Sequence, residues 1–407
     1  AAFDADPNGG EGVVSPGGVG YDINCGVRLL TTPLAVHDVR PRLGELVDEL
    51  FRSVPSGVGS SRADVKLNDP QLDRVLSGGA ARAVELGFGR AADLEAIEAG
   101  GRLEGAEPAR VSKRARDRGR DQLGTLGSGN HFVEVGWVDE TYDAEAASAL
   151  GVGVGTVTVL IHTGSRGLGH QVCDDHLDAM LAAAKRYGIE LPDPQLCCAP
   201  LTSPEAHAYW GAMNAAANFA FANRQLITHF VRRALDRVFG AAVAGDVDIV
   251  YDVAHNIAKL EEHEIDGKLR RVCVHRKGAT RALPPGHAEL APRFRELGQP
   301  VLVPGDMGRS SFVLLGLDRA ASETFASCCH GAGRRLSRHA AKREARPRNL
   351  VRELEAQGIL IRAASRATVD EEMPEAYKDV AGVVDVVAGA GLARKLARLR
   401  PLAVVKG

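Results

Sequence analysis

Cysteine, aspartate and histidine side chains recur along this 407-residue sequence in short segments framed by glycine. In one of them, GGVGYDINCGVR at positions 17–28, Asp22 and Cys25 lie three residues apart in a turn. A carboxylate and a thiolate that face one point form a strong chelate for a divalent metal ion. A structural aspartate turn beside an inert buried cysteine is the alternative, and this segment alone leaves both open.

Three more segments place a histidine where an expected strand meets a turn. His131 begins a strand after a glycine-rich loop, His162 ends the apolar run TVTVLIH, and His255 follows the apolar run IVYDVA. Side chains at such positions are held rigidly and remain reachable. Each histidine alone is as well explained as a core residue. Their occurrence together with Asp22 and Cys25 favours a site for Zn²⁺, Mn²⁺ or Co²⁺.

Two glycine-rich segments are candidates for binding phosphate. The loop before His131 offers backbone N–H groups, with Glu134 in reach. In CCHGAGRRLSRHAAKR, residues 328–343, His330 precedes a Gly-Ala-Gly run and a predicted basic helix. The start of that helix would attract an anion, and Arg334 and Arg338 would lie one turn apart on it. Neutral imidazole, with an ordinary pKa near ~6.5, is nucleophilic at physiological pH, so His330 is a candidate phosphoryl or nucleotidyl acceptor.

The composition sets the class of protein. The chain is 45% hydrophobic and 25% charged, which is typical of a folded globular protein. It has no apolar run of eighteen residues and no secretory signal pattern at its first residues. Seven cysteines, an odd number with two adjacent pairs, are typical of a reducing compartment. The sequence therefore predicts a cytoplasmic protein without a membrane partner.

The net charge of −2 gives no overall nucleic-acid signature, but two basic runs stand out. Both are interpreted either as solvated helix faces or as patches that contact phosphate. The first comprises Arg110, Lys113, Arg114, Arg116, Arg118 and Arg120, and the second Arg334, Arg335, Arg338, Lys342, Arg343, Arg346 and Arg348.

Secondary structure was predicted from periodicity. Helical spacing of apolar residues covers 42–53, 80–98, 170–187, 204–239, 317–345 and 387–399, and the residues after His255 are expected to begin a helix. Short β-branched runs predict strands at 157–162, 247–253, 270–276, 300–304 and 311–316. The irregular mixture favours an α+β fold over a doubly wound sheet. We expect one large domain over 1–407, in which residues 54–120 form a peripheral helical lobe.

Nine segments of the chain closely resemble the RtcB-type RNA ligases. They lie in order between residues 15 and 407, so the likeness covers nearly the whole chain. The matching runs are SPGGVGYDINCGVRLL, QLGTLGSGNHFVEV, IHTGSRGLGHQV, AHNIAKLEEH, HRKGATRALPPG, VPGDMGRSSFVLLG, ETFASCCHGAGRRLSR, PEAYKDV and PLAVVKG. The resemblance implies mixed β-sheets that line a central metal and nucleotide cleft, with helices around them.

The resemblance also implies a reaction. Members of the family are GTP-dependent enzymes that join RNA ends carrying a 3′-phosphate or 2′,3′-cyclic phosphate to 5′-hydroxyl ends, in tRNA splicing or RNA repair. His330 would become guanylated by GTP and pass GMP to the RNA 3′-phosphate, and the 5′-hydroxyl would then displace GMP from this RNA-3′-pp-G intermediate.

The cofactors and site residues implied by the resemblance are two Mn²⁺ ions and GTP. One ion would be held by Asp22, Cys25 and His131 and the other by Cys25, His162 and His255, with the thiolate bridging them. The GTP or GMP site would comprise Asn130, Phe132, Glu134, Ser311, Gly331, Ala332, Gly333, Tyr377 and Lys406. Arg166, Lys277, Arg334 and Arg338 would contact phosphate or RNA.

In one respect the sequence departs from the family, because members carry some further residues before the first glycine-rich run, and we expect that segment to be absent here. The expected partners are RNA, GTP and an archease-type activator, whose necessity the sequence leaves open, and a monomer is the expected state. Two other functions are alternatives to the RNA ligase. A dinuclear metal phosphatase or nuclease would use His330 as a general acid or ligand but would not need the guanine-pocket residues. An RNA-binding paralogue without activity would not need all five metal ligands.

Overall fold

In the computed structural model, which describes residues 1–6 and 10–407, an eight-stranded sheet occupies the centre of the molecule. Seven strands follow in the order β11 (Pro300–Val303), β12 (Ser311–Gly316), β15 (Ala393–Lys406), β4 (Phe132–Thr141), β5 (Thr156–Thr163), β3 (Gly26–Ala35) and β7 (Asp248–Ala254). These seven pair antiparallel, and β14 (Leu360–Ala363) adds to β15 in parallel. The edge strands β11 and β7 approach each other, so the sheet is nearly closed.

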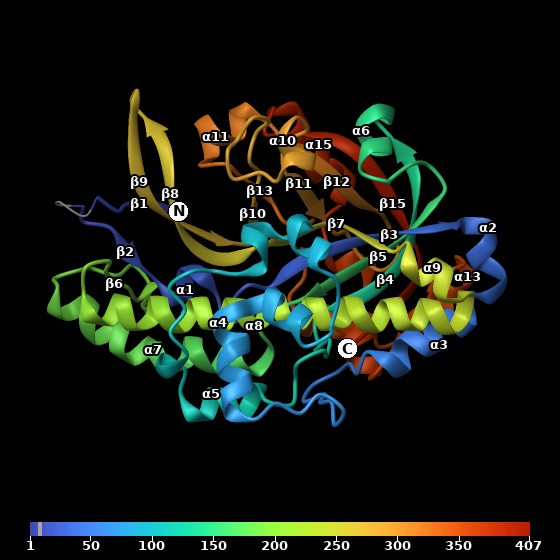
Figure 1. Cartoon of the computed structure of the whole chain (residues 1–407), viewed down its shortest axis with the longest axis horizontal. Helices are drawn as coiled ribbons and strands as arrows, with labels where there is room; N and C mark the ends of the chain where they lie inside the picture. The colour runs from blue at the N-terminus through green and yellow to red at the C-terminus, as the bar shows by residue number, and fades with distance from the viewer. Residues whose placement is uncertain (7–9) are drawn as a thin grey trace.

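Three smaller sheets surround the large one. The hairpin of β8 (Asn256–Ile265) and β9 (Lys268–Lys277) pairs with β1 (Ala2–Asp4) and projects from the body beside the N-terminus (Figure 1). β10 (Ala279–Arg281) pairs with β13 (Ser327–Cys329), and β2 (Val13–Val14) pairs with β6 (Ala199–Pro200). The predicted α+β class is confirmed by this mixture of sheets and helices.

The helix α8 (Pro204–Phe239) organises the helical side of the molecule. It starts on Ser203, whose hydroxyl accepts a hydrogen bond from the Ala206 N–H, and has proline in its first turn. Nearly every residue from Gly211 to Leu235 is buried, as expected of a helix that is covered on all sides. α8 runs beneath the sheet, and α7 (Arg166–Arg186), α4 (Asp69–Glu85) and α3 (Leu43–Ser53) pack against it (Figure 1).

Shorter helices complete the fold. They are α1 (Pro16–Val19), α2 (Val36–Val39), α5 (Lys113–Gly119), α6 (Ala144–Ala149), α9 (Ala241–Gly245), α10 (Pro292–Arg295), α11 (Asp318–Thr324), α12 (Arg338–Ala345), α13 (Leu350–Ala356), α14 (Arg366–Glu371) and α15 (Val380–Gly389). Within 54–120, the helix α4 contributes Leu72, Val75 and Leu76 to the main core, where they meet residues of α8. No helix among the described residues is long and apolar enough to cross a membrane. All seven cysteines are free thiols.

The sequence-based elements agree with the structure at 42–53, 170–187, 204–239 and at all five predicted strands. The helix predicted at 80–98 is wrong in its second half, because α4 ends at Glu85 and Gly87 follows with φ of 91°. The helix predicted at 317–345 is wrong in its middle, whereas α11 (Asp318–Thr324) and α12 (Arg338–Ala345) lie at its two ends. Residues Phe325 and Ala326, both with positive φ, end α11 and lead into strand β13 instead.

Two further helix predictions fail because tertiary pairing overrides helical periodicity. The stretch 387–399 contains the end of α15, a turn at Gly391 and the first half of β15. β15 lies between β12 and β4, where backbone groups need ladder partners on both sides. The residues after His255 form strand β8, not a helix, because they pair along their whole length with β9.

A buried guanidinium connects the large helix to the sheet. Arg224 of α8 donates to both carboxylate oxygens of Asp252 on β7, at 2.8 and 2.9 Å. The same side chain donates to the backbone carbonyls of Asn24 and Thr163, at 2.8 and 3.0 Å. Arg28 on β3 also donates to Asp252, at 2.7 Å, and all three charged side chains are fully buried. This arrangement fixes the ends of three neighbouring strands to one helix.

Replacing Arg224 by leucine should lower the free energy of unfolding by about 3–5 kcal/mol, since it removes one partner of a buried ion pair and leaves two strand-end carbonyls without donors. Urea denaturation followed by circular dichroism measures the change. Arg237→Leu is the matched control on the same helix, because Arg237 is half exposed and pairs with Glu49 near the surface. That variant should lose no more than about 1 kcal/mol. A loss that small in Arg224→Leu would contradict the role given to this guanidinium.

Candidate metal and nucleotide site

The turn before β3 brings Asp22 and Cys25 together. The Cys25 N–H donates to the Asp22 carbonyl at 2.9 Å, and Asn24 between them adopts a left-handed conformation with φ of 52°. Asparagine tolerates this conformation better than most residues with a side chain. Asn24 itself is held from α8 by Arg224. The turn therefore points the Cys25 thiol toward β5 and the carboxylate toward His131.

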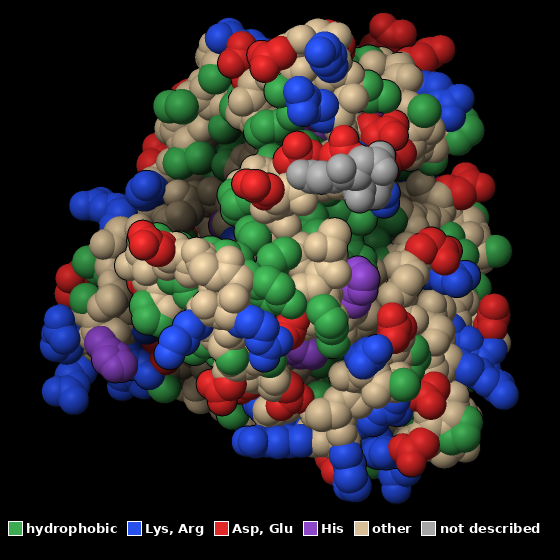
Figure 2. Space-filling model, turned by 90° about the vertical axis from the view of Figure 1, so that its left-hand side faces the viewer, with side chains coloured by type: hydrophobic (Ala, Val, Ile, Leu, Met, Phe, Trp, Pro, Cys, Tyr) green, Lys and Arg blue, Asp and Glu red, His purple; other side chains and the backbone are tan. Residues whose placement is uncertain are grey.

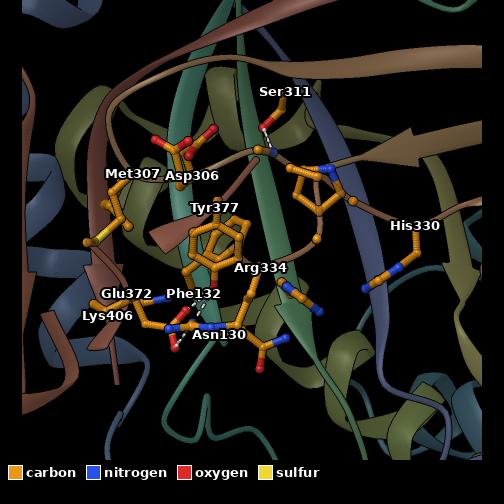
Figure 3. Close-up of a pocket in the computed structure, with 18 of the residues that line it drawn as sticks. Asn130, Phe132, Asp306, Met307, Ser311, His330, Arg334, Glu372, Tyr377 and Lys406 are labelled. Atoms are coloured by element: carbon orange, nitrogen blue, oxygen red, sulfur yellow. Dashed lines mark hydrogen bonds and ion pairs between the residues drawn. The ribbon is translucent and has the colours of Figure 1, made fainter. Parts of the chain in front are cut away.

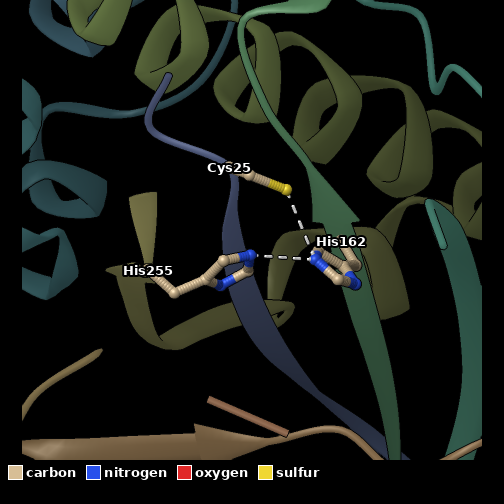
Figure 4. A group of neighbouring side chains, drawn as sticks. All are labelled: Cys25, His162 and His255. Atoms are coloured by element: carbon tan, nitrogen blue, oxygen red, sulfur yellow. Dashed lines mark hydrogen bonds between the residues drawn. The ribbon is translucent and has the colours of Figure 1, made fainter. Parts of the chain in front are cut away.

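The three predicted histidine ligands converge on Cys25 from neighbouring strands. Its Sγ lies 3.4 Å from the Nε2 of His131 and 3.4 Å from the Nε2 of His162. His162 Nε2 lies 3.3 Å from the Nε2 of His255, as Figure 4 shows. The five side chains form two groups of three potential ligands that share Cys25, namely Asp22, Cys25 and His131, and Cys25, His162 and His255.

The hydrogen bonding of His131 sets the direction of its nitrogen lone pair. Its Nδ1 lies 2.9 Å from the Leu126 carbonyl, an acceptor, so a neutral ring carries its proton on Nδ1. The Nε2 lone pair then faces Asp22 Oδ2 at 2.8 Å, and two acceptors at that distance repel each other. A bound cation, or a second proton on His131, removes the repulsion.

Burial also sets the protonation of the other ligands. It lowers the pKa of His162 and of His255 well below the ordinary value, so both imidazoles are neutral and able to bind a metal. It raises the pKa of the Cys25 thiol, which becomes a thiolate on metal binding. Burial opposes ionisation of Asp22, but the hydrogen bond and charge of His131 outweigh it and lower the pKa of Asp22. A thiolate, a carboxylate and imidazoles fit divalent ions such as Mn²⁺ or Zn²⁺.

The strand pairing next to these ligands builds a pocket. In the sheet, Phe132 of β4 pairs with His162 of β5 on one side and with Lys406 of β15 on the other. Because side chains alternate along a strand, Phe132 and Glu134 share a face of the sheet, as do Lys406 and Val404. Gly127, with φ of 94°, lets the loop before β4 pass close to Arg166 and His131, since a Cβ there would lie 2.3 Å from the Arg166 guanidinium.

All nine residues predicted for the GTP or GMP site line this pocket (Figure 3). His330, Arg334 and Arg338 line it as well. The full lining is Asn130, Phe132, Glu134, His162, Pro304, Gly305, Asp306, Met307, Ser311, His330, Gly331, Ala332, Gly333, Arg334, Arg338, Glu372, Tyr377, Val404 and Lys406.

An acidic and a basic side chain lie at the inner wall of the pocket. Burial raises the pKa of Glu134 to about 8, and Asp306 adds to the rise while Lys406 opposes it. Burial lowers the pKa of Lys406 to about 8, against the attraction of Glu372 and Glu134. Lys406 Nζ also lies 5.4 Å from the centre of the Phe132 ring. The wall thus offers an apolar ring with one acidic and one basic group beside it.

A second polar cluster lies at the mouth of the pocket. The buried carboxylate of Glu372 accepts hydrogen bonds from the Tyr377 hydroxyl and, at 3.0 Å, from Arg334. Arg338 lies 3.7 Å from the same carboxylate. Glu372 therefore holds a tyrosine and two arginines around the opening.

His330 connects the pocket to the metal ligands. It follows β13, whose pairing with β10 sets it beside Gly278, and its Nδ1 donates to the Gly278 carbonyl at 2.6 Å. The Nε2 lone pair is therefore available for reaction. Burial lowers the pKa of His330, so the ring is neutral at physiological pH. Its ring centre lies 4.6 Å from that of His255, a predicted metal ligand.

Three predicted phosphate contacts lie differently from the sequence-based expectation. Arg334 precedes α12, which begins at Arg338 after the cap Ser337, so the two arginines do not share a helix face as predicted. Arg334 instead forms an isolated antiparallel β-bridge with Tyr377. Arg166 lies behind the pocket, where it donates to Thr125 and Ser60, both at 3.0 Å.

Lys277 donates to the Gly17 carbonyl at 2.9 Å and lies outside the pocket lining. A contact of either Arg166 or Lys277 with phosphate stays a prediction.

Sequence reasoning missed several lining residues, chiefly Asp306, Met307 and Glu372. Asp306 and Met307 lie in the run VPGDMGRSS, which resembles the family, but neither was singled out because a turn residue between glycines gives no chemical signal. Glu372 follows another glutamate at the end of α14 and has the pattern of an exposed helix end. Its burial is decided by the packing of Tyr377 and Arg334 around it.

Comparison with known proteins agrees with this geometry. The family model described as "tRNA-splicing ligase RtcB" matches residues 1–407. A protein of Thermococcus kodakarensis named "tRNA-splicing ligase RtcB" is 56% identical over 408 residues, covering 100% of this chain and 84% of the relative. One of Archaeoglobus fulgidus with the same name is 54% identical, with the same coverage. The "RNA-splicing ligase RtcB" of Mycobacterium bovis is 52% identical, covering 100% of this chain and 92% of its own. The chain therefore belongs to the RtcB family of RNA ligases.

Proposed function

We propose that this protein joins RNA ends that carry a 3′-phosphate or 2′,3′-cyclic phosphate to 5′-hydroxyl ends, with GTP as the source of activation. The observation that carries the proposal is the position of His330, which lies between a nucleotide-sized pocket and a cluster of five metal ligands. Family membership supports the ligase class. RNA splicing or repair is the proposed role.

The first step uses His330 as a nucleophile. Its Nε2 forms a bond to the α-phosphorus of GTP, the bond from that phosphorus to the bridging oxygen breaks, and pyrophosphate leaves. The Gly278 carbonyl keeps the ring proton on Nδ1 and stabilises the positive charge that develops on the ring. Arg334 and Arg338 at the pocket mouth are placed to neutralise charge on the phosphates.

The next two steps transfer the activated phosphate. Where the RNA ends in a 2′,3′-cyclic phosphate, water first attacks the phosphorus and the bond to the 2′-oxygen breaks, which gives a 3′-phosphate and a 2′-hydroxyl. An oxygen of the RNA 3′-phosphate then attacks the phosphorus of GMP, and the bond to His330 Nε2 breaks, which gives RNA-3′-pp-G. The 5′-hydroxyl oxygen of the second RNA then attacks the RNA phosphorus, loses its proton and releases GMP. Activation is needed because a bare phosphate monoester would have to expel an oxide or hydroxide, which are poor leaving groups.

Two Mn²⁺ ions fit the ligand groups, one on Asp22, Cys25 and His131 and the other on Cys25, His162 and His255. Bound there, divalent ions would neutralise charge on the transferring phosphate and favour the ionised nucleophile. The residues themselves keep the site ready, because Leu126 fixes the tautomer of His131 and burial keeps His162 and His255 neutral.

Guanine fits the inner wall of the pocket. The Phe132 ring offers a stacking surface, and a carboxylate at Glu134 would accept hydrogen bonds from the N1–H and N2–H donors of guanine. Adenine has no hydrogen-bond donor at N1 and no amino group at C2, so it cannot donate these two hydrogen bonds. The buried ammonium of Lys406 beside this carboxylate favours its ionised form and complements an acceptor such as the guanine O6.

Guanylation is tested by incubating the protein with Mn²⁺ and GTP labelled at the α-phosphate. A covalent GMP adduct that is labile in acid should form on the wild-type chain and be absent from His330→Ala, because that variant lacks the nucleophile. His37→Ala, a change at an exposed histidine far from the pocket lining, is the control and should keep the adduct. Release of free phosphate without any adduct would contradict the proposal and indicate a metal-dependent hydrolase.

Titration with Mn²⁺, followed by calorimetry, tests the shared ligand. The wild-type chain should bind two ions, and His131→Ala and His255→Ala should each lose one, because each histidine belongs to a single group. Cys25→Ala should weaken both sites, since its thiolate is common to both groups. If Cys25→Ala kept one site at full affinity, the bridging role would be wrong.

Glu134→Gln tests the guanine contact. It should weaken GTP binding by roughly ten- to a hundredfold, since hydrogen bonds to a charged group contribute about 1.5–3 kcal/mol. Binding is measured by calorimetry with GTP and with ATP, and the preference for GTP should fall with it. Glu140→Gln on the same strand, where the side chain is partly exposed and pairs with Arg398, is the control. An unchanged GTP preference in Glu134→Gln would exclude this carboxylate from base recognition.

A further inference from the structure

The outer side of α12 carries basic residues that none of the steps above uses. We define the α12 face as Arg335, His339, Arg343 and Arg346, all of which are exposed. Within the described part of the chain, none of these four side chains has an ion-pair or hydrogen-bond partner. The face is therefore a concentration of positive charge that the protein does not itself neutralise.

Three of these four residues are aligned by their spacing along the helix, and Arg335 precedes it. In a helix with 3.6 residues per turn, His339, Arg343 and Arg346 follow an i, i+4, i+7 pattern and lie on one side. At 1.5 Å per residue, the line from Arg338 to Arg346 is about 12 Å long. Glu344, the acidic residue of α12, lies about 140° around the helix from His339.

Acidic residues near α12 are directed to its other cations. Glu372 binds Arg334 at 3.0 Å and lies 3.7 Å from Arg338, and Glu371 pairs with Lys342. The cations that border the pocket are thus partly neutralised and held in place. Those that point outward are left to solvent or to a ligand.

The other basic run of the sequence shows a different pattern. In and before α5, Arg110 pairs with Glu107, and Lys113 pairs with Asp117. Two more of its arginines are paired with carboxylates of α4, namely Arg116 with Asp73 and Arg120 with Asp69. That run consists mainly of internal ion pairs. Of the two basic runs, the second gathers its unpaired arginines on one face.

The α12 face begins where the pocket opens. Arg338, the first residue of α12, and Arg334 both line the pocket. If His330 transfers GMP to an RNA 3′-phosphate, as proposed above, that phosphate must enter past these two arginines. The nucleotides next to it then lie outside the pocket, and the α12 face continues from Arg338 at the next residue, His339.

We propose that the α12 face binds the phosphate backbone of the RNA strand that carries the 3′-phosphate, in the nucleotides adjacent to its end. This inference rests on the proposed ligase function. A single-stranded nucleic acid is commonly bound by a row of cations that follows its backbone, and such contacts set position without reading sequence. The phosphates of GTP would be reached from the pocket, whereas Arg346 at the end of the α12 face lies about 12 Å along the helix from Arg338, and none of the face residues lines the pocket.

The test compares RNA binding by the wild-type chain and by Arg343→Ala/Arg346→Ala. Fluorescence anisotropy with a short single-stranded RNA that ends in a 3′-phosphate is measured without GTP over a range of salt concentrations. Each lost phosphate contact on a single strand reduces the slope of log K against log salt by about 0.7, so the double variant should lose about 1.4. The contribution of these contacts vanishes at about 1 M salt. At 0.1 M salt, which is tenfold lower, a slope difference of about 1.4 means that the variant should bind RNA about 25-fold more weakly.

Arg270→Ala/Arg271→Ala is the matched control, because it removes the same charge from exposed positions on the β8–β9 hairpin. It should leave both the slope and the affinity unchanged. The α12 variant should also form the GMP adduct at the wild-type rate, and thermal unfolding checks that it is folded. If the alanine pair unfolds, Arg343→Gln/Arg346→Gln replaces it.

Wild-type RNA affinity and slope in a folded α12 variant would overturn the proposal. So would an equal loss in the hairpin control, which would indicate a general effect of charge. Loss of the GMP adduct with intact RNA binding would mean that this face serves GTP instead. If the wild-type chain formed no adduct at all, the proposed function would fail, while the RNA-binding comparison would still decide the role of the α12 face.

Discussion

One buried guanidinium holds the strand ends that carry three of the five candidate metal ligands, Cys25, His162 and His255. Arg224 reaches from α8 to Asp252 and to the carbonyls of Asn24 and Thr163. Asn24 precedes Cys25, and Thr163 follows His162. His255 directly follows the last residue of β7, the strand that contains Asp252. One side chain therefore fixes the ends of three strands from which metal ligands extend. Its planar fork of donors suits this task, because it satisfies several acceptors in fixed directions.

The candidate metal ligands and the pocket share residues. His162 contributes to both, as a member of one ligand group and as a wall of the pocket. The His330 ring packs against His255 on the side that faces the pocket. A phosphate held near His330 would therefore lie close to the metal ligands without any large movement of the chain. Rigid strands on both sides keep this geometry in place.

Burial is the main cause of the shifted pKa values at this site. It keeps His162 and His255 neutral, so that their nitrogen lone pairs are free for a cation. It brings the pKa values of Glu134 and Lys406 close together near 8, so each group is able to exchange a proton near physiological pH. At the mouth, by contrast, Glu372 offsets two arginines in a more open setting.

The sequence by itself predicted the candidate metal ligands, the α+β class and five strands that the structure contains. Asp22, Cys25 and three histidines could be recognised because their residue types and glycine-rich surroundings are local features. The long helix α8 was predicted with its observed limits, since its cap and its periodicity are also local. The family resemblance extended this to the nine pocket residues, all of which line one cavity.

The tertiary structure alone decided which neighbours these residues have. β15 has helical periodicity in its first half and became a strand because β12 and β4 supply hydrogen-bond partners on both sides. Glu372 gave no signal, since its burial results from residues that pack over it. The two basic runs looked alike in sequence, and only packing showed that one is largely paired with carboxylates of α4. Such outcomes depend on contacts between distant segments, which local sequence patterns do not contain.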